Sequence, residues 1–202
     1  MMLRVGLTGG YATGKSFIGD ELRRLGCHLI RADELGHLTL APGGEAYHPV
    51  IAAFGRSILK EDGSVDRQRL GHVVFHDPAR LAVLNSIVHP VVFRRQDECM
   101  RQYEAQDPNG IAVVEAAIMV ETGSHGKYEK LIVATCTLDQ QVERAMRRDG
   151  LTRERVLERI ARQLPLADKV KLADFVIDTS GSKEETLRQT RDVFQSLRSY
   201  RK

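Results

Sequence analysis

Short apolar runs recur along the chain, and longer stretches with helical spacing separate most of them. The runs cover residues 3–8 (LRVGLT), 27–30 (CHLI), 111–114 (IAVV), 131–134 (LIVA) and 175–177 (FVI). Because these runs lack a polar face, they are typical of strands that are buried on both sides. Such strands, joined by helices, predict an α/β fold with a five-stranded parallel sheet covered by helices.

The helical stretches differ in length. Apolar residues recur at helical spacing from about Lys15 until Gly26 ends the run. Residues 62–106 contain no convincing strand, so we expect two or more helices inserted between the second and third strands. Pro78 and Pro90 stand where such helices would begin.

Composition and charge narrow the class of protein. A chain of 202 residues can bury a sizeable core as one domain with small inserted subdomains. The net charge of +3 is too small to suggest a nucleic-acid partner, and the lack of an 18-residue apolar run argues against a membrane partner. Three widely spaced cysteines form neither a disulfide framework nor a zinc motif. A reducing cytoplasm fits this cysteine usage best.

The most specific local pattern is GGYATGKS at residues 9–16, which fits G-x-x-x-x-G-K-[ST]. A glycine-rich turn between a strand and a helix lets backbone N–H groups surround a phosphate, and the helix adds its positive end. Lys15 can reach the β- and γ-phosphates, and the Ser16 hydroxyl can bind Mg²⁺. We therefore expect this loop to bind a nucleoside triphosphate, ATP in a kinase, through Gly10, Tyr11, Ala12, Thr13, Gly14, Lys15, Ser16 and Phe17.

The loop alone leaves the reaction open. Residues 33–36 (DELG) match the D-x-x-G of switch GTPases, but no guanine-recognition motif follows the fourth strand. The third strand ends in Glu115 rather than the aspartate usual in motor ATPases. A kinase for a small acceptor, such as a nucleoside monophosphate, and a nonenzymatic nucleotide-dependent switch both remain possible interpretations at this point.

Two positions, one at a strand end and one at an expected helix entrance, are candidates for contact with an acceptor. Asp33 follows the second strand, where ligands of open parallel sheets bind, and its carboxylate could orient a hydroxyl and take its proton. It could equally cap the next helix. His89 precedes Pro90 and is therefore expected at a helix entrance, where a ligand contact and a capping role are both open.

Arginines crowd two expected helices on either side of Gly150, within residues 139–163. Such charges usually form a solvated face. They could also form a mobile lid that excludes water and neutralises a transferring phosphoryl group. The candidates are Arg144, Arg148 and Arg159.

Several stretches together resemble the dephospho-coenzyme A kinase family over nearly the whole chain. The matching segments are VGLTGGYATGKS, RADELGH, DGSVDRQRLGHVVF, LNSIVHPVV, AAIMVETG and RRDGLTRERVLERIARQLPLADKVKLADFVIDTSGS. The resemblance implies a single P-loop kinase domain over residues 1–202, with a helical coenzyme A-binding insertion at about 60–108 and a lid at about 139–165. It implies phosphorylation of the ribose 3′-hydroxyl of dephospho-coenzyme A by ATP with Mg²⁺, by a monomer or weak homo-oligomer.

The resemblance also implies roles for individual residues. It marks Asp33 as the catalytic base, and Lys15, Arg144 and Arg148 as the groups that act on the phosphates. The expected acceptor-binding residues are Thr8, Asp33, His89 and Glu121. The chain departs from the family pattern at three positions, where Arg31 replaces an acid, Ala117 a proline and Thr179 an asparagine.

Overall fold

The protein is described by a computed structural model that covers residues 1–75 and 77–200. Its chain divides into two compact units. One unit joins Met1–Arg31 to Arg101–Lys202 and contains the sheet, and the other consists of Ala32–Met100 and is helical.

The sheet confirms the predicted fold class. Its five strands, all parallel in the described part of the chain, have the order β2-β3-β1-β4-β5, so β1 lies in the centre. The strands are β1 (Leu3–Gly9), β2 (His28–Arg31), β3 (Ile111–Glu115), β4 (Lys130–Thr135) and β5 (Phe175–Asp178). Each differs from its predicted apolar run by only one or two residues. Because all five run the same way, their carboxyl ends share one edge of the sheet.

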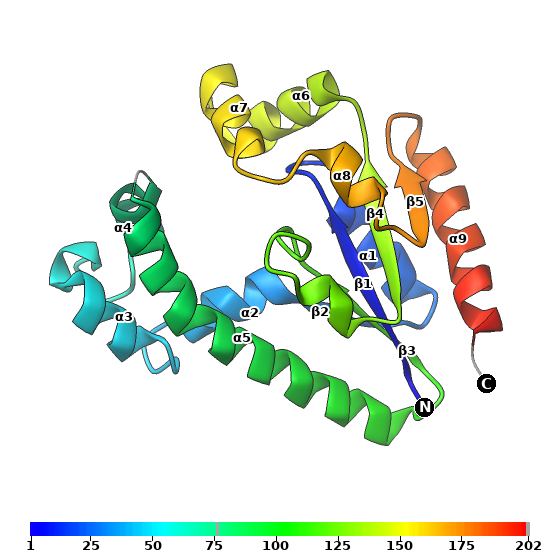
Figure 1. Ribbon diagram of the computed structural model, residues 1–202, viewed down its shortest axis with the longest axis horizontal. Coiled ribbons are helices and arrows are strands. Elements are labelled where there is room, and N and C mark those ends of the chain that lie inside the picture. The colour runs from blue at the N-terminus through cyan, green and yellow to red at the C-terminus, as the bar shows by residue number, and fades with distance from the viewer. Residues whose placement is uncertain (76, 201–202) are drawn as a thin grey trace. The chain divides into compact units, whose positions relative to one another are not determined.

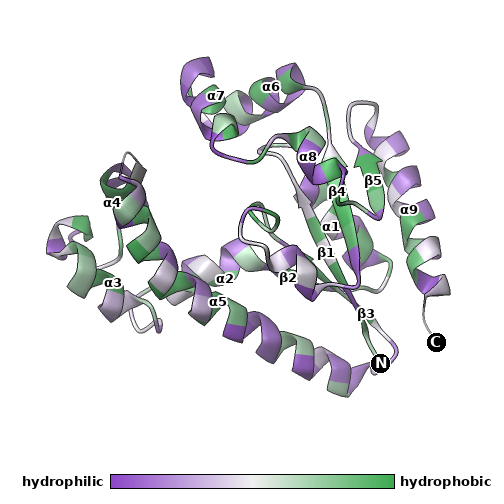
Figure 2. Cartoon of the chain, in the orientation of Figure 1, coloured by the Kyte–Doolittle hydropathy of each residue, from purple (hydrophilic) through white to green (hydrophobic). Residues whose placement is uncertain are grey.

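Among the helices of the same unit, α1 (Lys15–Arg24) and α9 (Lys183–Ser199) pack against the sheet (Figure 1). The others are α6 (Leu138–Asp149) and α7 (Arg153–Ala161), which Figure 1 shows beyond the ends of the strands, and α8 (Leu166–Val170), with a 3₁₀ turn, η2, at Ser124–Lys127. The two predicted helices on either side of Gly150 are thus confirmed as α6 and α7. Figure 2 shows apolar strands beside helices that alternate between apolar and polar positions, as expected for helices with one buried face.

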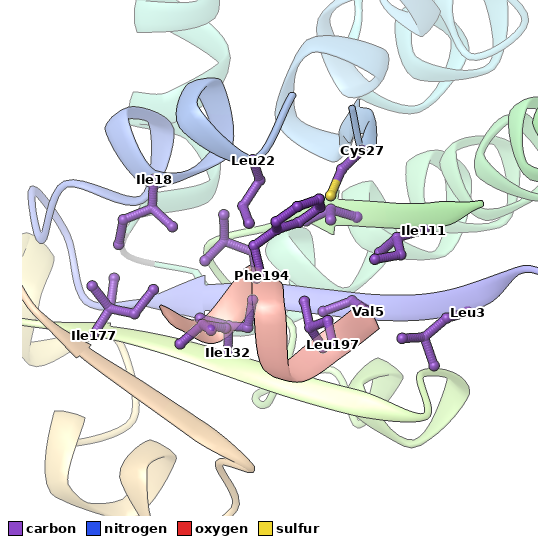
Figure 3. Packing of buried hydrophobic residues seen from close by; sticks show 14 residues of the cluster. Leu3, Val5, Ile18, Leu22, Cys27, Ile111, Ile132, Ile177, Phe194 and Leu197 are labelled. Carbon is purple, nitrogen blue, oxygen red and sulfur yellow. The ribbon is translucent and has the colours of Figure 1, made fainter. Parts of the chain in front are cut away.

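The main core lies between the sheet and the helices α1 and α9. Figure 3 shows Phe194 of α9 among side chains from the strands and from α1, including Val5, Leu22 and Ile132. Val5, Leu22 and Ile132 are fully buried. This packing fixes α1 against the sheet, and with α1 the loop that precedes it.

The helical unit has its own apolar core. Its elements are α2 (Ala32–Thr39), α3 (Tyr47–Phe54), the 3₁₀ turn η1 (Arg56–Ile58), α4 (Arg67–Phe75) and most of α5 (Pro78–Gln106). Val50, Ile58 and Leu70 are among the buried residues of its core. The unit thus begins directly after β2, whereas the sequence placed the insertion at about 60–108.

The predicted helix start at Pro90 is wrong, whereas the one at Pro78 is confirmed. Pro90 lies inside α5, a helix of 29 residues. An internal proline costs a helix about 3 kcal/mol because it lacks an N–H and crowds the preceding turn. Apolar residues just before and after it, including Val88 and Val91, pack against the core of the helical unit, and this packing keeps the helix continuous.

A buried carboxylate joins α1 to α9. Glu21 of α1 is 5% exposed and accepts hydrogen bonds from Arg24 Nε at 2.7 Å and from Arg191 Nε of α9 at 2.9 Å. The hydrogen bond from Arg24, with that from Arg191, lowers the pKa of Glu21 from 4.5 to about 2 against the opposing effect of burial.

We expect Glu21→Gln to lower the free energy of unfolding by about 1–2 kcal/mol at pH 7, since it removes charge-assisted hydrogen bonds. The folded carboxyl stays ionised between its unfolded value of 4.5 and about 2, so the wild type loses this advantage as the pH falls through that window. Urea unfolding at pH 7 and pH 3 measures the difference, with Glu61→Gln in an exposed turn as the control. An equal difference at both pH values would contradict the assignment.

Candidate active site

The loop between β1 and α1 has the strand–loop–helix context that the sequence predicted. Gly14 precedes α1 with a left-handed φ of 83°, and the Phe17 N–H donates to its carbonyl at 3.1 Å. The backbone at Gly9 is so close to β4 that a Cβ atom there would lie 2.5 Å from the Ala134 carbonyl oxygen. Glycine is therefore required at both ends of this loop, for conformation at one and for space at the other.

Ala12 carries conformational strain within the loop. Its φ of 58° is the only positive φ of a non-glycine residue in the described chain. Left-handed backbone costs an alanine roughly 1 kcal/mol. Ala12 and Tyr11 pack against an apolar cluster formed by Val142, Ala145 and Val156 of α6 and α7, and this packing offsets the strain.

The side chains of Lys15 and Ser16 both contact fixed groups. Lys15 Nζ donates to the Gly10 carbonyl at 2.9 Å. Ser16 Oγ donates to Oε1 of Glu115, the last residue of β3, at 2.6 Å. Glu115 is 7% exposed, and its other oxygen, Oε2, is buried without a hydrogen-bond partner among the described residues. The loop serine is thus joined to a buried carboxylate with one oxygen that accepts no hydrogen bond from the described residues.

Arg31 contributes a positive charge beside that carboxylate. Its Nε lies 3.4 Å from Glu115 Oε2, within ion-pair distance, and its Nη2 donates to Asp20 of α1 at 2.6 Å. The departure from the family pattern at this position therefore places a positive charge between two acids at the carboxyl end of β2.

A cavity of about 460 Å³ lies over the loop. Its lining combines loop residues with arginines of α6: Ala12, Thr13, Gly14, Lys15, Ser16, Phe17, Arg144, Arg147 and Arg148. The structure thus brings the predicted Arg144 and Arg148 to the loop. Arg147 also lines the cavity, although it was not among the predicted site residues.

Polar contacts order these arginines. Arg144 donates to Thr179 at its hydroxyl (2.9 Å) and at its carbonyl (2.6 Å). Thr179 is 5% exposed, and its hydroxyl lies 3.0 Å from the Thr13 carbonyl of the loop. The threonine that departs from the family pattern therefore joins the loop to Arg144.

Tyr11 connects the loop to α6 and α7. The guanidinium groups of Arg148 and Arg159 lie 5.2 and 5.7 Å from the centre of its ring. Its hydroxyl bonds to Asp149, which also accepts two hydrogen bonds from Arg148 at 2.8 and 2.9 Å. The hydrogen bonds to Asp149 raise the pKa of Arg148. Arg148 and Arg159 are thus held beside the loop, although both remain exposed to solvent.

Thr8 and Glu121, two of the predicted acceptor-binding residues, make internal contacts within the unit that contains the sheet. Thr8 is fully buried, and its hydroxyl lies 3.5 Å from the Ala117 carbonyl. Glu121 forms an ion pair with Lys169 at 2.6 Å and accepts a hydrogen bond from the Leu164 N–H at 3.1 Å. Their predicted contact with an acceptor remains a prediction.

The other two predicted acceptor-binding residues, Asp33 and His89, belong to the helical unit. Asp33 is exposed and is the second residue of α2, so it lies in the first turn rather than at the cap. His89 lies inside α5 instead of at a helix entrance, because the helix continues through Pro90. Its ring centre is 5.9 Å from that of Phe93, and burial lowers its pKa.

The parallel sheet, the glycine-bounded loop with Lys15 and Ser16, and the arginine-lined cavity define a P-loop kinase fold. The family model described as dephospho-CoA kinase matches residues 3–185. The dephospho-CoA kinase of Carboxydothermus hydrogenoformans is 40% identical over 191 residues, which cover 95% of this chain and 92% of that protein. The chain belongs to the dephospho-CoA kinase family.

Solved structures agree with this assignment. A crystal structure of a Thermus thermophilus protein superposes with a TM-score of 0.85 at 30% identity, covering 96% of this chain and 97% of that one. The dephospho-CoA kinase of Campylobacter jejuni superposes with a TM-score of 0.72 at 26% identity, with 98% of each chain covered. The predicted family and fold are therefore confirmed.

Proposed function

We propose that this protein transfers the γ-phosphoryl group of ATP to the ribose 3′-hydroxyl of dephospho-coenzyme A, giving coenzyme A and ADP in the last step of coenzyme A biosynthesis. The observation that carries the proposal is the cavity over the phosphate loop, lined by Lys15, Ser16 and three arginines, in a chain of this family. Phosphoryl transfer depends mainly on positioning and on neutralising charge, and this lining supplies cations for both.

The loop amides, Lys15 and two of the arginines around the cavity have distinct parts in the proposed reaction. The loop amides from Gly10 to Phe17 bind the polyphosphate, and Lys15 exchanges its bond to the Gly10 carbonyl for the β- and γ-phosphates. Arg144 and Arg148 neutralise the charge that develops on the transferred group. Because both guanidinium groups already have fixed partners, ordering them costs little when nucleotide binds.

The residues around Ser16 fit a magnesium ion. Mg²⁺ prefers oxygen ligands and keeps several waters, and here a serine hydroxyl lies beside a buried carboxylate whose Oε2 has no hydrogen-bond partner in the described chain. Ser16 would ligate the ion, and Glu115 would accept hydrogen bonds from its waters. When bound, the ion would neutralise charge on the phosphates.

Asp33 is the proposed catalytic base. It would orient the 3′-hydroxyl of the acceptor and take its proton as the oxygen attacks the γ-phosphorus and ADP leaves. The position of Asp33 along the chain supports this role. Asp33 lies two residues after the carboxyl end of β2, and the phosphate loop follows β1 of the same sheet. Thr8, His89 and Glu121 remain the proposed acceptor-binding residues, with the helical unit as the proposed binding region.

Release of ADP with a panel of acceptors tests the function. We expect rapid turnover with dephospho-coenzyme A and little with nucleoside monophosphates, shikimate, gluconate or no acceptor. Preference for another compound of the panel would replace the proposed acceptor. Slow hydrolysis that no acceptor stimulates would instead indicate a nucleotide-dependent switch.

We expect Asp33→Asn to lower kcat by about 10²–10⁴ while the affinity for ATP stays unchanged, because only proton transfer and orientation are lost. Steady-state kinetics and nucleotide binding measure the two effects separately. Glu34→Gln, which removes a charge from the same helical turn, serves as the control. Normal turnover of Asp33→Asn would refute the base assignment.

We expect Glu115→Gln to raise the Mg²⁺ concentration needed for half-maximal nucleotide binding by about 10- to 100-fold, the range typical for lost outer-shell partners of a metal. Calorimetric titration with ADP at several Mg²⁺ concentrations measures this shift. Binding of ADP in EDTA is the internal control and should match the wild type. An unchanged Mg²⁺ dependence would remove Glu115 from the metal site.

A further inference from the structure

We propose that Lys169 is a positioning residue that fixes the amino end of the phosphate loop and ties it to the segment after the arginine-rich helices α6 and α7. Lys169 lies on α8, was not among the predicted site residues, and has no part in the phosphate chemistry described above. The inference rests on the proposed function, because it concerns how the same nucleotide site keeps its shape.

The burial of this lysine is exceptional. Its side chain is 0% exposed and is among the largest fully buried side chains of the described residues. Removing an ammonium group from water costs several kcal/mol unless its hydrogen bonds are replaced. Lysine has three N–H donors, and three oxygens surround Nζ: Glu121 Oε1 at 2.6 Å, the Ala117 carbonyl at 3.0 Å and the Gly9 carbonyl at 3.3 Å. Donors and acceptors therefore match in number.

Each acceptor belongs to a segment that borders the nucleotide site. Gly9 ends β1 and begins the phosphate loop. Ala117 and Glu121 lie in the segment after β3, which starts just beyond Glu115, the partner of Ser16. One ammonium group thus joins the carboxyl-end segments of β1 and β3 to α8.

The contact with Gly9 bears directly on phosphate binding. A peptide group is planar, so fixing the direction of the Gly9 carbonyl also fixes the direction of the Gly10 N–H. Gly10 is the first of the proposed phosphate-binding amides. A hydrogen bond from an ammonium group further polarises the same peptide and strengthens its N–H as a donor.

The contact with Glu121 bears on the arginine-rich helices. Glu121 Oε1 also accepts a hydrogen bond from the Leu164 N–H, in the segment that connects α7 to α8. The chain leaves the sheet after β4, forms α6 and α7, and returns at this point. Lys169 and Glu121 therefore fix the return end of the helix pair that carries Arg144 and Arg148.

Stability alone does not account for a charge at this position. Replacing a buried ion pair by apolar side chains of similar size is often neutral or stabilising. A methionine would fill the volume, but it would remove the hydrogen bonds that Lys169 donates to the Gly9 and Ala117 carbonyls. Among the contacts of the described residues, Ala117 would keep only the longer one with the Thr8 hydroxyl. The lysine is the residue that both fills this space and orients two carbonyls and a carboxylate.

The test compares Lys169→Met with Lys171→Met, a change at the residue that directly follows the same helix, where the side chain is 74% exposed and paired with Asp168. We expect Lys169→Met to weaken binding of the ATP analogue adenylyl imidodiphosphate about tenfold. We also expect kcat to fall about 10- to 100-fold, in line with small displacements of a binding loop. Calorimetry and steady-state kinetics, both well below the melting temperature, give these values, and Lys171→Met should match the wild type.

Trypsin gives a readout that needs no activity, since α6 and α7 contain many arginines. The analogue should protect these arginines from cleavage in the wild type and in Lys171→Met, but much less in Lys169→Met. If Lys169→Met does not fold, Glu121→Gln keeps the side-chain size and removes only the charge. Glu121→Gln should weaken binding of the analogue and lower kcat, each by about three- to tenfold, and should also reduce the protection from trypsin.

The possible outcomes separate the inference from the proposed function. A lower melting temperature with unchanged nucleotide affinity, kcat and protection in the folded variant would show a merely structural role and overturn the inference. So would wild-type values in Glu121→Gln. A wild type that binds the analogue but does not phosphorylate dephospho-coenzyme A would overturn the proposed acceptor and leave Lys169 in its role. A wild type that binds no nucleotide would overturn both.

Discussion

The short turn from β1 to α1 is the constraint on which the rest of this structure depends. Hydrogen bonds within the turn, such as those from Thr13 and Lys15 to the Gly10 carbonyl, are supplemented by contacts with neighbouring segments. Glu115 of β3 accepts from Ser16, Thr179 lies beside the Thr13 carbonyl, and Lys169 donates to Gly9. The sheet, α8 and the segment after β5 therefore all help to define one binding surface.

Several cations around the cavity are already paired with other groups of the protein. Three of the cations that line the cavity have internal partners: Lys15 has the Gly10 carbonyl, Arg144 has Thr179 and Arg148 has Asp149. Neutral carbonyl and hydroxyl partners can be exchanged for phosphate oxygens at little cost, because charged acceptors make stronger hydrogen bonds. A carboxylate such as Asp149 competes more strongly, so Arg148 is better suited to a defined position than to free movement.

Local patterns in the sequence predicted most of the fold and part of the site. Strands buried on both faces are recognisable from apolar runs alone, and the phosphate loop is a contiguous motif. The predicted helix start at Pro90 was wrong because packing along the long helix α5 outweighed the local preference of proline for the first turn of a helix. The roles of Glu115 and Lys169 could not be read from spacing, since their partners Ser16 and Gly9 lie 99 and 160 positions away. Only the fold brings such residues together.

The helical unit leaves the sheet after β2 and the chain re-enters it as β3, and these two strands are direct neighbours. The whole excursion, including the 29-residue α5, therefore interrupts no other pairing in the sheet. A module inserted in this way can be lengthened, shortened or exchanged while the remaining strand register is preserved. Evolution or design could thus alter which molecule is recognised without rebuilding the machinery that handles the nucleotide.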